Sequence, residues 1–151
     1  MVYHPTLPMV YFSNEQGIGL SSYQRKINGQ LKVAQDINIL PAGMSKIGLS
    51  ASDLVITPNG EFLFAGLRGH SQDFNRISRY RILKDGRAEF IGLTNADRIP
   101  WGLTLSPDGR FLLVSATAGA SLTAYQIAPD GDLKKITSLP WDPKMSDLIA
   151  R

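Results

Sequence analysis

The chain has 151 residues, of which 43% are hydrophobic and 19% are charged, and its formal net charge is +3. This composition suits one folded domain with a core of moderate size, and the scattered lysines and arginines form no basic stripe that would indicate nucleic-acid binding. The lack of cysteine excludes disulfides, zinc–thiolate sites and a cysteine nucleophile. No apolar run approaches the ~18 residues of a membrane span and no secretory signal follows Met1, so we expect a cytoplasmic protein that does not bind membranes.

Residues 1–41 contain the first copy of a unit of short predicted strands. These strands cover residues 1–3, 9–13, 20–25 and 31–33. His4-Pro5 follows the first strand, and Asn28-Gly29 separates the third strand from the fourth. Apolar alternation interrupted by tight glycine turns is typical of antiparallel hairpins.

The second copy, residues 50–94, repeats this order. Its predicted strands cover residues 54–57, 62–65, 77–82 and 88–91. The first turn is Pro58-Asn59-Gly60, and an insertion occupies residues 69–76. An insertion in one copy of a repeat usually falls on a loop face that binds something.

The third copy, residues 100–140, has the same order again. Its predicted strands cover residues 103–106, 111–114, 122–127 and 133–136. After it, residues 145–151 have the pattern of one more innermost strand, because residues 146–149 echo residues 52–55.

Three meanders about fifty residues apart predict an all-β fold, namely a β-propeller segment of about three four-stranded antiparallel blades plus a C-terminal latch strand. We expect residues 1–151 to form a single partial propeller domain. Propellers close with roughly four to eight blades, so three blades leave a ring open. Two alternatives follow: the chain is the C-terminal portion of a longer propeller, or it completes a ring as a homo-oligomer, a dimer joined through the open blade edges.

The meander order separates two rims of the predicted propeller. Tight proline and glycine turns lie on one rim, and longer polar loops lie on the other. We therefore expect a ligand site on the loop rim, near the innermost strands. The candidates are Asn14, Glu15, Asp53, Arg68 and His70.

Each candidate has a functional and a structural interpretation. Glu15 could be a general base or a solvated loop acid, and Asp53 could face the axis or cap its strand in an Asx turn. Arg68 could bind a carboxylate or phosphate, or form an ion pair between blades. His70 could move protons near neutral pH, or simply be solvated.

The remaining polar residues indicate less. Asp97, Arg98 and Trp101 lie on the loop rim and could line the pocket, although we expect Trp101 to pack between blades, and His4 is expected to be structural. The two histidines are far apart in the chain and no carboxylate cluster has metal-ligand spacing, so no metal site is expected. No Gly-x-Ser-x-Gly motif occurs, which argues against a serine nucleophile.

The pattern of these residues resembles the seven-bladed propeller lactonases, the family of propeller-type 6-phosphogluconolactonases and fungal carboxymuconate cyclases. The resemblance is carried by residues 1–5, by residues 10–15 ending in Asn14-Glu15, by residues 52–60, and by Arg68 after the next strand. It covers essentially the whole chain and corresponds to the C-terminal portion of the family's fold.

The resemblance implies a pocket at the central channel that binds and hydrolyses a sugar lactone without a metal or other cofactor. We expect Glu15 and Asp53 to be catalytic, and Arg68, Asn14 and His70 to bind the substrate. In this mechanism a carboxylate activates a water that attacks the lactone carbonyl, while Arg68 holds an anionic group or the developing oxyanion. Two other functions fit the same residues: a non-catalytic binding or assembly module, and a lactonizing isomerase.

Overall fold

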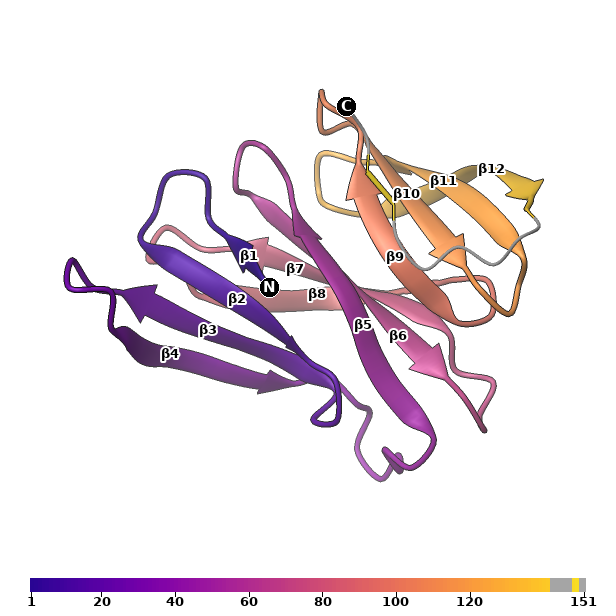
Figure 1. Ribbon diagram of the computed structural model, residues 1–151, viewed down its shortest axis with the longest axis horizontal. Coiled ribbons are helices and arrows are strands. Elements are labelled where there is room, and N and C mark those ends of the chain that lie inside the picture. Colours follow the sequence, from indigo (N-terminus) through magenta and orange to yellow (C-terminus); the bar gives the residue numbers. More distant parts are fainter. Residues whose placement is uncertain (142–147, 150–151) are drawn as a thin grey trace.

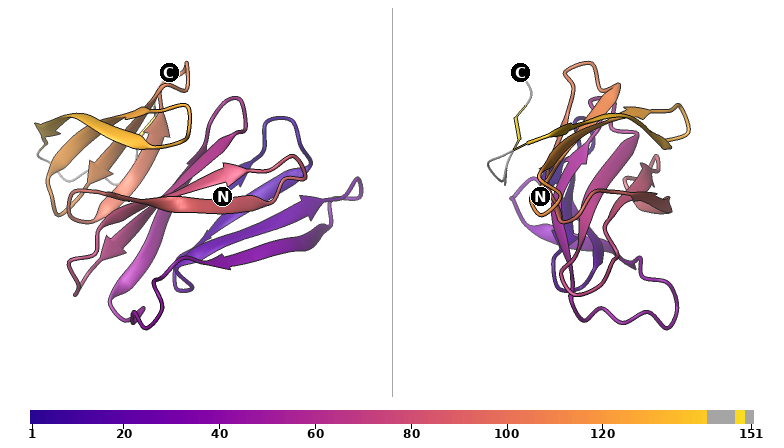
Figure 2. Two further views of the ribbon diagram at one scale, coloured as in Figure 1. Left: turned by 180° about the vertical axis from the view of Figure 1, so that it is seen from behind. Right: turned by 90° about the vertical axis from the view of Figure 1, so that its right-hand side faces the viewer.

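The computed structural model describes residues 1–141 and 148–149, and it is built from twelve β-strands in three sheets. Those residues contain no helix, and hence none that could cross a membrane. The sheets are twisted layers that lie side by side, as the front view and the view from behind show (Figures 1 and 2). The predicted all-β propeller segment of three four-stranded antiparallel blades is confirmed.

Each sheet is a meander in which strands adjacent in the chain are adjacent in the sheet. Blade 1 contains β1 (Val2–Tyr3), β2 (Met9–Asn14), β3 (Gly19–Arg25) and β4 (Leu31–Asn38). Blade 2 contains β5 (Leu49–Ile56), β6 (Phe62–Gly69), β7 (Arg76–Ile82) and β8 (Ala88–Asn95). Blade 3 contains β9 (Pro100–Leu105), β10 (Phe111–Ala116), β11 (Ser121–Ile127) and β12 (Leu133–Pro140). The expected latch strand, residues 145–151, falls mostly outside the described residues and stays a prediction.

Two hydrophobic cores join the blades, and β6 contributes to both. Leu63 and Leu67 lie in the core shared with blade 1, whereas Phe62 and Phe64 lie in the core shared with blade 3. Because side chains alternate along a strand, a strand between two blades is apolar on both faces, and every residue of β6 is buried. Full burial of each large apolar side chain contributes about 1.5–3 kcal/mol.

Glycine turns hold the blades together at the tight-turn rim. Gly86 has a φ of 81° and lies so close to Met9 of blade 1 that a Cβ would stand 2.4 Å from the Met9 Cγ. Gly131 repeats the contact against Phe62 of blade 2 at 2.6 Å. The Tyr11 hydroxyl also donates a hydrogen bond to the Gly86 carbonyl at 2.8 Å. This close packing at one rim leaves the other rim for the longer loops.

Two of the innermost strands carry bulges. The β5–β6 register shifts between Ala51 and Leu54, which leaves Ser52 and Asp53 outside the ladder. The β9–β10 register skips Trp101 in the same way. Bulges redirect side chains and are common beside functional sites.

Candidate functional site

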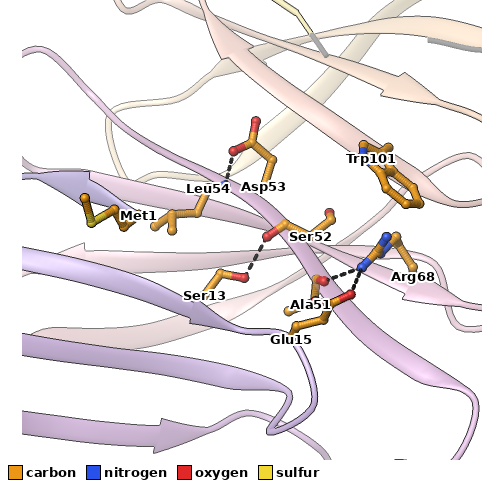
Figure 3. Close-up of a pocket in the computed structure, with 9 residues that line it drawn as sticks. All are labelled: Met1, Ser13, Glu15, Ala51, Ser52, Asp53, Leu54, Arg68 and Trp101. Atoms are coloured by element: carbon orange, nitrogen blue, oxygen red, sulfur yellow. Dashed lines mark hydrogen bonds and ion pairs between the residues drawn. The ribbon is translucent and has the colours of Figure 1, made fainter. Parts of the chain in front are cut away.

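The two bulged strands and the end of β2 enclose a cleft of about 420 Å³ (Figure 3). Residues from all three blades line it: Met1, Ser13, Glu15, Ala51, Ser52, Asp53, Leu54, Arg68 and Trp101. Three of the predicted site residues, Glu15, Asp53 and Arg68, are therefore brought together on one cleft. The structure does not test their chemical roles, which stay predictions.

Arg68 lies at the centre of the cleft wall. It is only 4% exposed, and its Nη2 donates 2.8 Å hydrogen bonds to Glu15 Oε1 and to the Ala51 carbonyl. Because Glu15 belongs to blade 1 and Arg68 to blade 2, this contact is also the ion pair between blades that the sequence left as an alternative. The Glu15 side chain is 64% exposed, so its carboxylate remains accessible from the cleft.

Trp101 lies against one face of the Arg68 guanidinium. The Arg68 Cζ lies 4.2 Å from the Trp101 ring centroid, within the range of a cation–π contact. The Arg68 Nε is buried and has no hydrogen-bond partner among the described residues. A buried donor without an acceptor carries a free-energy cost.

Asp53 connects blades 2 and 3 beside the cleft. Its Oδ1 accepts a hydrogen bond from its neighbour's backbone, Leu54 N–H, at 2.8 Å, and its Oδ2 accepts one from Leu103 N–H in β9 at 3.0 Å. The Asp53 carboxylate thus accepts backbone hydrogen bonds from blades 2 and 3 while it lines the cleft.

Two serines complete the polar wall. The Ser13 hydroxyl donates to the Ser52 carbonyl at 2.6 Å, and the Ser52 hydroxyl donates to the Pro100 carbonyl at 2.8 Å, so one hydrogen-bonded chain crosses all three blades. The sequence interpretation missed both serines, and for Trp101 it favoured packing between blades over a place in the pocket. The repeat itself could have found two of them, because Ser52 and Trp101 each precede the apolar stretch at Leu54 or Leu103 by the same spacing.

The other two predicted ligand-binding residues lie outside the set that lines the cleft. The exposed His70 places its Nε2 2.8 Å from the Ser50 hydroxyl. The Asn14 amide forms hydrogen bonds with Ser21 inside blade 1. Neither side chain contributes to the cleft as the structure describes it, and their roles in substrate binding stay untested predictions.

Asp97 has a partner set of its own in blade 3. Its carboxylate accepts hydrogen bonds from Ser121 and Thr123 at 2.8 and 2.7 Å and pairs with the Lys135 ammonium at 3.2 Å. Partial burial would raise the pKa of Asp97, but the two hydroxyls and Lys135 outweigh it and lower the pKa to about 2. Asp97 therefore connects the loop before β9 to the two outer strands of blade 3, and it does not line the cleft.

His4 is held in the turn of blade 1. Its Nδ1 accepts hydrogen bonds from the backbone N–H groups of Thr6 and Leu7 at 3.1 and 2.9 Å. Burial lowers the pKa of His4 below its ordinary value, against a smaller opposing effect of a backbone hydrogen bond with Gly60. Within the described residues no group of three or more acidic or histidine side chains could hold a metal ion.

Comparison with known proteins gives the family. Residues 1–144 match the family described as Lactonase, 7-bladed beta-propeller. The chain belongs to this family. The resemblance inferred from the sequence is thereby confirmed.

Curated relatives include the 6-phosphogluconolactonase of Yersinia pseudotuberculosis serotype O:3 strain YPIII, which is 28% identical over 141 residues. That of Pectobacterium carotovorum strain PC1 is 29% identical over 139 residues. The two alignments cover 92% and 90% of this chain but 40% of each relative. The chain thus spans well under half the length of the curated relatives it matches.

Solved structures share the fold. A periplasmic gluconolactonase of Pseudomonas aeruginosa superposes with a TM-score of 0.80 at 24% identity, over 89% of this chain and 37% of that one. A protein from Lactobacillus plantarum gives a TM-score of 0.86 at 18% identity, over 97% and 42% of the two chains. At these identities the likeness concerns the propeller architecture alone.

Proposed function

We propose that the cleft binds and hydrolyses a sugar lactone such as 6-phosphogluconolactone, and that the protein acts in the cytoplasm. The observation that carries this proposal is the convergence of Glu15, Asp53 and Arg68 from two blades on one cleft. A lactonase needs a base for water and a cation for the carbonyl oxygen, and the cleft offers both. Relatives named 6-phosphogluconolactonase support the choice of substrate class.

The chemistry requires one proton acceptor and one donor to the oxyanion. A carboxylate removes a proton from water, the hydroxide attacks the lactone carbonyl, and Arg68 stabilises the negative charge on the carbonyl oxygen. When the tetrahedral intermediate collapses, the bond from the carbonyl carbon to the ring oxygen breaks and that oxygen takes up the proton, which gives the open-chain acid.

Glu15 is the better candidate for the base. Both Asp53 oxygens already accept backbone hydrogen bonds, whereas the Glu15 carboxylate is bound to Arg68 through Oε1 and its side chain is 64% exposed. The contact with Arg68 also orients Glu15 beside the group that would bind the oxyanion. The ion pair keeps the carboxylate beside the guanidinium, and a base and an oxyanion donor that act on one carbonyl group must be neighbours.

The test is the rate of proton release from glucono-1,5-lactone and its 6-phosphate, corrected for spontaneous hydrolysis. Glu15→Gln should lower kcat by about 100-fold or more, the typical contribution of a general base. Glu89→Gln is the matched control, because Glu89 is an exposed acid on β8 outside the cleft. Equal rates for the two variants, or no turnover above background in the native chain, would contradict the proposal.

A non-catalytic role is the second candidate, and a specific observation favours it. Arg68 and Asp53 both form contacts between blades, as residues of a structural module would. In that case the cleft binds a ligand or serves assembly without turnover. A lactonizing isomerase would use the same groups in the reverse direction, and would be recognised by lactone formation from an unsaturated acid.

We also infer that two copies of this chain associate head to tail. The outer face of blade 3 carries Phe111 and Leu113 at the repeat positions of Phe62 and Phe64, which fill the core between blades 2 and 3. Blade 1 in turn carries Tyr23 at the position of the buried Tyr80. Blade 3 of one copy is thus equipped to receive blade 1 of another.

Exposed apolar residues extend these two faces. Val33, opposite Tyr23, is 56% exposed, and Leu139, opposite Leu122, is 54% exposed. Two such contacts related by a twofold axis would give six blades, a number with which a propeller can close.

A further inference from the structure

Trp101 reaches the cleft because β9 is bulged. It occupies the same repeat position as Ser52, two residues before Leu103 as Ser52 is before Leu54. Both residues lie outside their strand ladders and both line the cleft. A bulge in the innermost strand therefore places a hydroxyl from blade 2 and an indole from blade 3 at the cleft.

One face of this indole is covered and much of the ring is open. The Arg68 Cζ stands 4.2 Å from the ring centroid, and Figure 3 shows Arg68 between Trp101 and Glu15. Trp101 nevertheless remains 39% exposed, whereas a tryptophan that only packed between blades would be covered on both faces. An aromatic side chain at the edge of a polar cleft is a typical element of a small-molecule site.

We propose that the open face of Trp101 stacks against the six-membered ring of the sugar lactone. This inference rests on the proposed function and names the part of the substrate that the cleft recognises. The C–H groups of a saturated sugar ring carry partial positive charge, which matches the negative face of an aromatic ring. Arg68 on the covered face fixes the plane of the indole, and the exposed Glu15 carboxylate can accept hydrogen bonds from hydroxyls at the edge of the ring.

The charges in the cleft agree with an uncharged ring rather than a phosphate at this position. The lining side chains include two carboxylates, Glu15 and Asp53, and one guanidinium, Arg68, which is already paired with Glu15. A phosphate placed here would lie beside two carboxylates and would meet no unpaired side-chain cation among the lining residues, which is unfavourable. A 6-phosphate on the substrate therefore lies outside the stack with Trp101.

The chain has two tryptophans, so the test uses the Trp141→Phe variant, in which Trp101 is the one that remains. D-Glucono-1,5-lactam, a stable neutral ring with the shape of the lactone, is titrated while tryptophan emission is recorded. The lactam should change the emission saturably, and inorganic phosphate should not. Open-chain gluconate should bind about tenfold more weakly, because it has no ring to stack.

Two substitutions separate stacking from folding. By calorimetry, Trp101→Leu should raise the Kd for the lactam about tenfold, whereas Trp101→Phe should stay within about threefold of the native chain. The Trp141→Phe chain is the control for the loss of an indole outside the cleft. An unchanged emission, an unchanged Kd in Trp101→Leu, or tighter binding of phosphate than of lactam would overturn the inference.

The outcome for stacking is distinguishable from the outcome for catalysis. Lactam binding at Trp101 without any lactone hydrolysis would refute the proposed function and leave the stack in place. Lactone hydrolysis with an unchanged KM in Trp101→Leu would refute the stack and leave the function in place.

Discussion

Arg68 stands 4.2 Å from the ring centroid of Trp101, and this contact joins the second strand of blade 2 to the innermost strand of blade 3. The same guanidinium forms a 2.8 Å ion pair with Glu15 of blade 1. One nearly buried cation therefore connects all three blades at the wall of the cleft. Its removal should affect both the stability of the fold and the binding of ligands.

Arg68→Ala should lower the free energy of unfolding by about 1–3 kcal/mol, because the Ala51 carbonyl and Glu15 lose their donor and the Trp101 face loses its cover. Arg68→Lys should recover part of this loss, since an ammonium retains the charge but not the planar contacts. Arg110→Ala is the control, because Arg110 is 74% exposed in its ion pair with Asp108 and should contribute at most about 0.5 kcal/mol. Urea unfolding measures all three, and similar losses for Arg68→Ala and Arg110→Ala would contradict this role.

Arg68→Ala also separates the two roles considered for this residue in catalysis. If Arg68 stabilises the oxyanion, the variant should lose kcat by about the same factor, roughly 100-fold, on glucono-1,5-lactone and on its 6-phosphate. If Arg68 binds an anionic substituent, the variant should lose far more kcat/KM on the phosphorylated lactone. Because Arg68 is already paired with Glu15, we expect equal losses of kcat on the two lactones. A selective loss on the phosphorylated lactone would instead support the anion-binding role.

The stability of the fold should depend on pH through His4. Its folded-state pKa lies below 6.5, so the unfolded chain binds the proton more readily. The contribution of neutral His4 is therefore complete above pH 6.5 and declines as the pH falls through that value toward the lower folded-state pKa. Thermal unfolding between neutral and mildly acidic pH should show this decline in the native chain and in His70→Gln, and a reduced decline in His4→Gln. If the stability of His4→Gln falls with pH as steeply as that of the native chain, the decline arises from other groups.

Association of two copies should be visible by sedimentation equilibrium at micromolar concentration. Val33→Glu and Leu139→Glu each place a charge on one of the two outer faces and should shift the chain toward monomer. Ile27→Glu is the control, since Ile27 is fully exposed on the tight-turn rim. A native chain that is a well-folded monomer, and that stays so when residues 145–151 are deleted, would refute this association.

The sequence predicted the blades because the same order of strands and turns occurs in three copies. Tight turns such as Asp85-Gly86 fix the strand order, and the alternation along β6 fixes which residues face each neighbour. The same meander order placed Glu15, Asp53 and Arg68 on one rim, where the structure brings them onto one cleft.

The details of the cleft were harder to predict. A bulge depends on the pairing of two strands rather than on one residue type, so Ser52 was not identified as lining the site, and packing between blades was favoured over the cleft for Trp101. The hydrogen bond between His70 and Ser50 and the amide contacts of Asn14 depend on loop geometry, which repeat patterns do not encode. Arg68 forms the ion pair between blades and also lines the cleft, so the structural interpretation does not exclude the predicted functional one.

The central claim, that the cleft between Glu15, Asp53 and Arg68 is the lactone site, is tested most directly by mapping the bound ligand on the isotope-labelled chain by NMR. On addition of D-glucono-1,5-lactam, the Arg68 Nε–H, the Trp101 indole N–H and the Leu54 amide should shift together with one binding curve. The resonances of the Trp141 indole N–H and of the backbone amides around Asp97 should not shift. Shifts confined to the Asp97 region, or none at the cleft at saturating lactam, would contradict the claim.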